Sequence, residues 1–243
     1  MDAVAPGRCA GCDAPAAAVL CEGCVAHLLG LAVPPPLPLA AAVCRPALPW
    51  DEVVRRTVHR AKYRACPRAM HLLAAVAAER LAPELAGGNQ AALVVPVPLG
   101  SGRRRRRGYN QAEVAARALA AAMAGARLGT GLRRVRDTDP QVGRDGAARR
   151  RNLRGAFAWS GPPPDATVWL VDDVVTTGAT LDAAVEALQR AGTRRIEAVA
   201  VAVSGAGAVG EYATHRGGCA PPRPPRAADA ERRSPRATQW WTP

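Results

Sequence analysis

The chain has 243 residues, a formal net charge of +13 and a pI near 10.8. This length allows one substantial domain with a small appendage, and the charge indicates an anionic partner such as phosphate, pyrophosphate or nucleic acid. Lys62 is the only lysine and alanine, glycine and proline are abundant, a bias typical of a GC-rich genome, so the basic excess is weaker evidence for an anionic partner. Five Trp, three Tyr and one Phe are too few aromatic residues for a platform that stacks on single-stranded bases.

Cysteine usage and hydropathy favour a cytoplasmic protein. The seven cysteines are an odd number, which argues against a closed disulfide framework. No signal peptide precedes Cys9, and the apolar stretch 25–43 contains His27 and a run of prolines, so we expect no membrane span. We therefore expect a cytoplasmic location, with cysteines that are reduced or bound to metal.

Two CxxC pairs near the N-terminus predict a metal site. They are separated by eight residues and supply four thiols, Cys9, Cys12, Cys21 and Cys24. Each pair can place two thiolates on one metal ion, and two pairs complete a tetrahedral zinc site. A redox pair or a disulfide is the alternative, which a cytosolic chain disfavours. Residues 1–28 are therefore predicted to form a knuckle with structural Zn²⁺, whose binding supplies much of its folding energy.

Residues 29–50 are rich in proline and are predicted to form an irregular, semi-extended linker. Beyond it, the patterns predict helices over 51–63 and 68–81, and then a short apolar strand over 92–98. Five consecutive arginines flanked by glycines follow this strand, and we interpret Arg103–Arg107 as a loop that traps an anion. A solvated charge run or a basic nucleic-acid patch is the alternative.

The stretch 167–181 contains the strongest chemical signal. An apolar run at 168–171 predicts a strand buried on both faces of a parallel sheet. Asp172 and Asp173 stand at its expected end, and a small hydroxylated loop at 176–180 leads into an amphipathic helix. Loop N–H groups and the helix dipole would hold a phosphate group. The alternative is an ordinary strand–turn–helix of a doubly wound sheet.

The remaining segments complete a pattern of alternating strands and helices. Residues 110–124 predict a helix, 132–135 a short strand and 195–203 another buried strand. A charged, glycine-containing segment between 136 and 154 is expected to be mobile. Residues 204–243 lack an apolar period and are predicted to be a disordered tail.

Three of these segments resemble the ComF family, a branch of the type I phosphoribosyltransferases named for bacterial DNA-uptake competence. The resemblance covers about residues 8 to 203. It rests on the acid pair with T-T-G-x-T in 168–181, on V-P-V-P-L and R-G-Y-N-Q-A-E around the arginine run, and on T-x-x-Q and R-x-x-N-x-x-x-A-F over 138–157. It implies an α/β fold, a type I phosphoribosyltransferase-like parallel sheet with flanking helices, over residues 51–203.

The resemblance also implies a ligand, phosphoribosyl pyrophosphate with Mg²⁺. Asp172 and Asp173 would contact the ribose hydroxyls and assist the magnesium ion. The sugar phosphate would lie on the loop made of Thr176, Thr177, Gly178, Ala179 and Thr180. The pyrophosphate would lie against Arg107, Gly108, Asn110 and Gln111. A hood loop that closes over the sugar would include Thr138, Gln141, Arg149 and Asn152.

One departure from the wider family concerns the acceptor. Purine phosphoribosyltransferases have an acidic general base in the phosphate loop, at the position that Thr176 holds here. Salvage of hypoxanthine or guanine is therefore not expected, and the acceptor and the catalytic residues are left open. The resemblance also implies an alternative function, an accessory protein of DNA uptake that binds single-stranded DNA and a partner helicase, with little or no catalysis.

Overall fold

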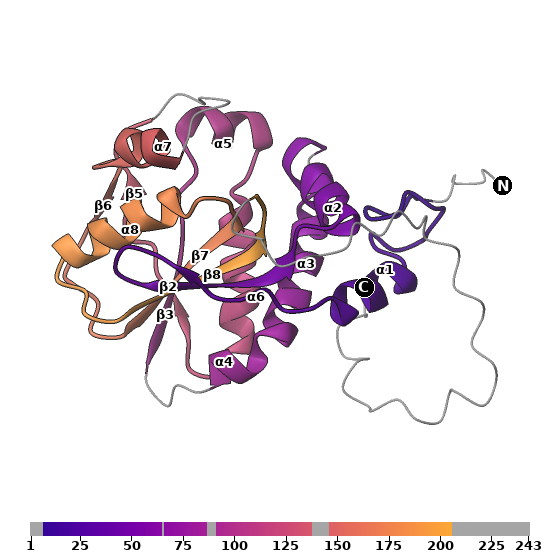
Figure 1. Cartoon of the computed structure of the whole chain (residues 1–243), viewed down its shortest axis with the longest axis horizontal. Coiled ribbons are helices and arrows are strands. Elements are labelled where there is room, and N and C mark those ends of the chain that lie inside the picture. Colours follow the sequence, from indigo (N-terminus) through magenta and orange to yellow (C-terminus); the bar gives the residue numbers. More distant parts are fainter. Residues whose placement is uncertain (1–6, 65, 87–90, 138–145, 206–243) are drawn as a thin grey trace.

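A computed structural model of the protein describes residues 7–64, 66–86, 91–137 and 146–205 (Figure 1). The tail predicted over 204–243 therefore lies almost entirely outside the described residues, as do Thr138 and Gln141 of the predicted hood loop. Within the described ranges, no helix has both the length and the apolar character needed to cross a membrane.

The centre of the molecule is a six-stranded sheet. Only its first strand is antiparallel to its neighbour, and the other five are parallel. In spatial order the strands are β1 (Leu37–Pro38), β2 (Val43–Pro49), β8 (Ile196–Val203), β7 (Thr167–Val175), β3 (Ala92–Pro96) and β4 (Arg127–Leu128). A separate antiparallel ribbon pairs β5 (Leu132–Arg134) with β6 (Phe157–Trp159).

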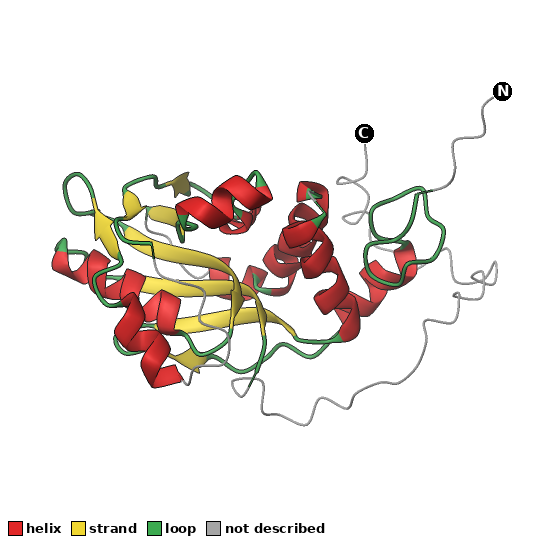
Figure 2. Cartoon of the chain, turned by 90° about the horizontal axis from the view of Figure 1, so that it is seen from above, coloured by secondary structure: helices red, strands yellow, loops and turns green. Residues whose placement is uncertain are grey.

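Helices cover both faces of the sheet (Figure 2). Their apolar side chains form two hydrophobic cores. The larger core packs four helices against one face: α1 (Glu22–Gly30), α2 (Glu52–Tyr63), α3 (Pro67–Arg80) and α6 (Gln111–Ala122). The other core lies between the sheet, α8 (Ala179–Arg190) and the β5–β6 ribbon. Three shorter helices complete the fold: α4 (Ala82–Ala86), α5 (Ser101–Arg107) and α7 (Gly146–Leu153). The predicted α/β class with a mainly parallel sheet is confirmed.

The central strands form where the sequence has continuous apolar runs. The last six residues of β8 are all buried, as a strand covered on both faces requires.

Two helices begin at a residue whose side chain accepts a hydrogen bond from the first turn. Asp51 accepts from the Val54 N–H at 2.8 Å, and Asn110 accepts from the Ala112 N–H at 3.2 Å.

The prediction of an irregular linker is wrong for residues 43–49. These residues form β2, which pairs in parallel with β8 from Cys44 to Pro49. Prolines at 46 and 49 are tolerated because β1 pairs only with Val43 and Cys44, which leaves the rest of β2 at a sheet edge.

The arginine run is also not a loop. Ser101–Arg107 form α5, because arginine is a strong helix former and Gly108, at φ 76°, supplies the left-handed end of the helix.

The acid pair also lies at a different place from the one predicted. Strand β7 continues through Asp172 and Asp173 to Val175, whereas we expected both acids to follow its end.

The N-terminal segment is fastened to the domain by Arg80, the last residue of α3. Its guanidinium donates to three carbonyls at the end of α1, those of Leu28 at 3.1 Å, Leu29 at 2.7 Å and Leu31 at 2.5 Å. It also donates to Ala47 O of β2 at 2.9 Å. Helix-end carbonyls have no partners within their own helix, so this side chain satisfies groups from two elements at once.

We expect Arg80→Ala to lower the free energy of unfolding by about 2 kcal/mol, because these carbonyls lose a charged donor. Denaturant unfolding measures the change. Arg117→Ala is the matched control: Arg117 is exposed on α6 and bonds only to Glu113 among the described contacts, so about 0.5 kcal/mol or less is expected. Equal effects of the two substitutions would contradict the fastening role.

Candidate functional site

The acid pair lies in the last part of β7, where successive side chains point to opposite faces of the sheet. Asp173 faces α2, and its Oδ2 lies 2.9 Å from Lys62 Nζ. Both side chains are mostly buried, with 13% and 18% exposure. The ammonium approaches Oδ2 off the hydrogen-bonding direction, so the contact is an ion pair. Asp173 Oδ1 accepts from the Val174 N–H at 2.8 Å, which fixes the carboxylate.

Asp172 is held as a protonatable group beside this ion pair. Its Oδ1 accepts from the Asp173 N–H at 2.8 Å. Burial raises the pKa of Asp172 to about 7, and the negative charge of Asp173 adds to the rise. An acid pair with one charged and one protonatable carboxylate suits a cation, because a cation relieves the repulsion between the two groups.

The predicted phosphate loop connects β7 to the start of α8. Gly178 adopts φ 75° and caps the helix, and its carbonyl accepts from the Asp182 N–H at 2.8 Å. Thr176 and Thr177 are exposed. A left-handed glycine before a helix N-terminus turns successive N–H groups outward, and this geometry suits an anion.

The β1–β2 hairpin lies against this loop. A Cβ on Gly178 would stand 2.9 Å from Leu39 Cδ2, so a larger residue would press on the hairpin. Ala40 N–H donates to Asp182 Oδ1 at 2.8 Å. The segment predicted to be a linker therefore packs beside the candidate site. This contact could not be predicted from the local sequence, because Ala40 and Asp182 are far apart along the chain.

The predicted pyrophosphate segment starts α6 and is bonded to two other elements. Asn110 Nδ2 donates to Val97 O at 2.9 Å, just beyond β3. Tyr109 OH donates to Ala61 O of α2 at 2.5 Å. Arg107 donates to Gln111 Oε1 at 3.0 Å and lies over the exposed Tyr63 ring, 5.5 Å from its centre. These contacts bring the pyrophosphate segment, α2 and the acid pair together.

Gln111 is a buried polar residue in this cluster, with 1% exposure. Its Nε2 has no aligned hydrogen-bond acceptor among the described residues. The nearby Tyr109 hydroxyl has a pKa raised chiefly by burial, and the Gln111 amide opposes that rise. Gln111 itself belongs to the predicted pyrophosphate segment, and a buried amide donor there suits an acceptor such as a phosphate oxygen.

A buried arginine that the sequence did not single out lies on the ribbon side. The side chain of Arg134 is 8% exposed, with its guanidinium 5.3 Å from the Phe157 ring centre. Burial lowers its pKa, Arg103 lowers it further, and the charge of Asp172 opposes these effects.

Asp137, at the end of the ribbon segment, accepts hydrogen bonds from the Ser101 N–H at 3.1 Å and from the Ser101 hydroxyl. These bonds attach α5 to the ribbon.

The predicted hood residues are only partly described. Thr138 and Gln141 lie outside the described residues, and Arg149 belongs to α7. Asn152 is half-buried at the end of α7, and its carbonyl accepts from Arg136 Nη2 at 2.8 Å. Their role in closing over a ligand stays a prediction.

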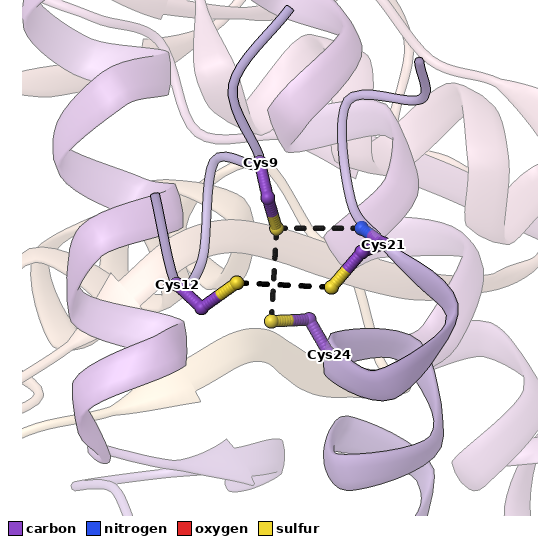
Figure 3. Close-up of side chains that lie close together, drawn as sticks. All are labelled: Cys9, Cys12, Cys21 and Cys24. Atoms are coloured by element: carbon purple, nitrogen blue, oxygen red, sulfur yellow. Dashed lines mark hydrogen bonds between the residues drawn. The ribbon is translucent and has the colours of Figure 1, made fainter. Parts of the chain in front are cut away.

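The second candidate site is the thiol cluster formed by Cys9, Cys12, Cys21 and Cys24 (Figure 3). All four sulfur atoms lie within 4.8 Å of one another. The Sγ–Sγ distance is 3.7 Å both for Cys9 with Cys24 and for Cys12 with Cys21. A tetrahedral zinc site with Zn–S bonds of about 2.3 Å has sulfur–sulfur edges of about 3.8 Å. The four thiols therefore fit a metal ion such as zinc.

The cluster also favours a thiolate at Cys9. Burial acts to raise the pKa of Cys9, but N–H donors outweigh it and lower the pKa to about 6. Gly11 N–H lies 3.4 Å and Cys21 N–H 3.3 Å from Cys9 Sγ. Burial raises the pKa of Cys24. One thiolate is thus prepared before a metal arrives, and a bound cation would deprotonate the others.

Comparison with known proteins assigns the domain to a family. Residues 74–218 match the model of the phosphoribosyl transferase domain. Competence protein F of Haemophilus influenzae is 37% identical over 107 residues, 43% of this chain and 47% of that protein. The DNA utilization protein YhgH of Salmonella typhimurium is 31% identical over 177 residues, 67% of this chain and 76% of that protein. YhgH of Escherichia coli K12 is 33% identical over 104 residues, 43% and 46% of the two chains.

The matched segment thus spans about half of the Haemophilus protein and about three quarters of the Salmonella protein. The domain model covers more than half of this chain, and the acid-pair strand and phosphate loop lie inside it. The N-terminal thiol cluster accompanies that domain. The chain belongs to the ComF family and carries a phosphoribosyltransferase domain.

Proposed function

We propose that the protein binds phosphoribosyl pyrophosphate with Mg²⁺ and is a phosphoribosyltransferase whose acceptor is unknown. The observation that carries the proposal is the arrangement at the end of β7, where two adjacent carboxylates precede a left-handed glycine that starts α8. Carboxylates suit ribose hydroxyls and a magnesium ion, and the loop N–H groups suit the 5-phosphate.

The groups around the acid pair suggest how such a ligand would be held. Arg107 and the Gln111 amide belong to the segment that would meet the pyrophosphate. The bond between the anomeric carbon and a pyrophosphate oxygen would break, and the bond to the acceptor nucleophile would form at that carbon. Mg²⁺, when bound, would neutralise charge on the departing pyrophosphate. The chain's own residues would orient the sugar and neutralise its phosphates.

Titration calorimetry with phosphoribosyl pyrophosphate and Mg²⁺ tests the proposal directly. We expect one binding site per chain and little binding when Mg²⁺ is omitted. Ribose 5-phosphate, which lacks the pyrophosphate, is the matched ligand control and should bind more weakly. Absence of binding to the zinc-loaded full chain would refute the proposed ligand.

The affinity for this ligand should rise with pH. Asp172 has a pKa raised to about 7, so below that pH the free protein holds a proton that a magnesium complex displaces. Affinity should therefore increase about tenfold per pH unit below pH 7 and level off above it. Calorimetry in two buffers of different ionisation enthalpy should detect about one proton released near pH 6. A flat profile between about pH 5.5 and 8 would contradict this coupling.

The same raised pKa of Asp172 has the opposite effect on the unliganded protein: its stability falls as pH rises, whereas its ligand affinity increases. The folded state holds the Asp172 proton more tightly than the unfolded chain, whose carboxyl titrates near 3.8. Its contribution to stability is complete below pH 4 and is lost as pH rises through about 7.

We also propose that the metal in the thiol cluster is structural Zn²⁺, since four sulfur ligands leave no open coordination position. Reduced thiols are required for this metal, which supports a cytoplasmic location. Atomic emission on purified protein should find about one zinc ion per chain.

A second candidate function is supported by the names of the relatives. These are a competence protein and DNA utilization proteins, so the chain is also a candidate accessory protein of DNA uptake that binds single-stranded DNA and a partner helicase. Arg104, Arg105 and Arg106 are exposed on α5 and could contact phosphates. In this function the thiol cluster would dock the helicase, and catalysis would be weak or absent.

A salt series with single-stranded DNA separates the two functions. Phosphate contacts make the logarithm of the binding constant fall with the logarithm of salt concentration, by about 0.7 for each phosphate neutralised. An accessory protein should show DNA affinity with this dependence and no binding of the sugar phosphate. The sugar-phosphate site instead predicts ligand binding that survives replacement of Arg104, Arg105 and Arg106 by glutamine.

A further inference from the structure

Helix α2 contacts both candidate sites. It has 12 residues, Glu52–Tyr63, and is therefore about 18 Å long. In Figure 1 it lies between the N-terminal loops and the rest of the domain. Val54, Val58 and Ala61 are buried in the larger core, so the helix is firmly packed along its inner face.

The thiol cluster packs tightly against the first turn of α2. A Cβ on Gly11 would stand 2.8 Å from Val53 Cγ1 and 2.9 Å from Cys24 Sγ, so the first CxxC turn has no free space toward the helix. Beyond Cys24, His27 of α1 pairs with Asp51, the residue that caps α2.

The third turn of α2 is bonded to the cluster through Arg60. Its guanidinium pairs with Asp13, directly after Cys12, and donates to Arg8 O at 3.3 Å. Arg60 is only 27% exposed, and Asp13 also accepts from Arg8 at 2.8 Å. The conformation of the chain around Cys9 and Cys12 is therefore linked to the position of Arg60.

The C-terminal end of the same helix meets the acid pair. Lys62 follows Arg60 by two residues, and its ammonium lies 2.9 Å from Asp173 Oδ2. Ala61 O accepts the Tyr109 hydroxyl at 2.5 Å, and the Tyr63 ring faces Arg107. A shift of this helix end would move the partner of Asp173 and two contacts of the pyrophosphate segment together.

We propose that α2 couples the metal-loaded thiol cluster to the sugar-phosphate site, with Lys62 as the positioning residue for Asp173 and Arg60 as the link to the metal site. The identity of the ligand rests on the proposed function. The link from the thiol cluster through Arg60 and Lys62 to Asp173 does not depend on that ligand. Metal binding fixes the Cys9–Cys12 turn and so holds Arg60. Arg60 in turn holds the helix end that presents Lys62. Binding free energies are reciprocal, so the sugar phosphate also strengthens metal binding by the same factor.

The experiment compares two arginines on the same helix. Arg60→Ala removes the bond to the cluster, whereas Arg55→Ala removes only an exposed pair with Glu52 and is the matched control. The Kd for phosphoribosyl pyrophosphate with Mg²⁺ is measured by calorimetry on the full chain, zinc-loaded and zinc-stripped. Zinc affinity is measured by chelator competition with and without the ligand.

In the wild type, zinc removal should weaken ligand binding about 5- to 150-fold, and the ligand should raise zinc affinity by the same factor. Arg60→Ala with zinc bound should weaken ligand binding about fivefold or more, and Arg55→Ala should leave it unchanged. In Lys62→Met, zinc removal should change the ligand affinity by less than about twofold, because the coupling contact is absent.

A ligand-free readout separates this proposal from the proposed function. Amide exchange at residues 61–63 and at Val174 should be faster in zinc-loaded Arg60→Ala than in zinc-loaded Arg55→Ala. This comparison needs no zinc removal, so it also holds if the stripped protein unfolds. Faster exchange without any sugar-phosphate binding would refute the proposed ligand and retain the coupling. Equal exchange and equal ligand affinity in the two variants would overturn the coupling.

Discussion

Replacing Asp172 and Asp173 together by asparagine should weaken the binding of phosphoribosyl pyrophosphate with Mg²⁺ by at least about 100-fold. Both carboxylates lose the charge that a magnesium ion and the ribose hydroxyls would require. Lys62, which lies 2.9 Å from Asp173 Oδ2, would be left as an uncompensated buried cation that repels the metal. Calorimetry gives the affinity, and circular dichroism shows whether the variant is folded.

The matched control for this variant is Asp182→Asn. Asp182 is an acid in the first turn of α8, close to the phosphate loop, but it accepts a hydrogen bond from the Ala40 N–H of the hairpin. The amide oxygen of asparagine keeps that bond, so ligand affinity should change less than about threefold. If the double variant bound the ligand as well as Asp182→Asn does, the acid pair would not be the site.

Loss of the metal from the thiol cluster should have the largest effect on stability. Cys9, Ala10, Leu20, Cys24 and Leu28 are fully or almost fully buried and belong to the same core as α2 and α3. A chelator strong enough to remove zinc should lower the free energy of unfolding by roughly 5 kcal/mol, because metal binding stabilises only the folded arrangement. The metal-free protein should also unfold at a lower temperature in a calorimetric scan.

Cys24→Ser and Cys66→Ser separate loss of the cluster from loss of a thiol. Cys24 Sγ lies 3.7 Å from Cys9 Sγ, whereas Cys66 is outside the cluster, at the start of α3. Cys24→Ser should reproduce the loss of stability and of bound zinc, and Cys66→Ser should change stability by about 1 kcal/mol or less. Equal melting temperatures of the chelated and untreated proteins would show that the metal contributes nothing to the fold.

The central elements could be predicted because their signals are local. The apolar run of β7, the mostly buried β8 and the amphipathic α8 are each indicated by a pattern within a dozen residues. Strand β2 could not be predicted, because Pro46 and Pro49 indicate a linker. Their tolerance depends on a sheet edge formed by residues far away in sequence.

The candidate site shows the same division. The acid pair and the predicted phosphate loop are contiguous in sequence, although β7 extends further than expected, and their contacts with a ligand stay a prediction. Helix α5 was predicted as a loop, although the helix propensity of arginine and the glycine at 108 are local signals of a helix. The pairing of Lys62 with Asp173 and the burial of Arg134 depend on tertiary contacts that no local pattern contains.

The ion pair of Lys62 with Asp173 can be followed by chemical labelling of the lysine amine. The sequence has one lysine, so an amine-selective acylating reagent finds a single side chain in the whole protein. That side chain is 18% exposed and sits against the acid pair, so its rate of acylation reports on one contact. Mass spectrometry of the acylated chain can therefore follow this contact in the natural sequence, without a substitution.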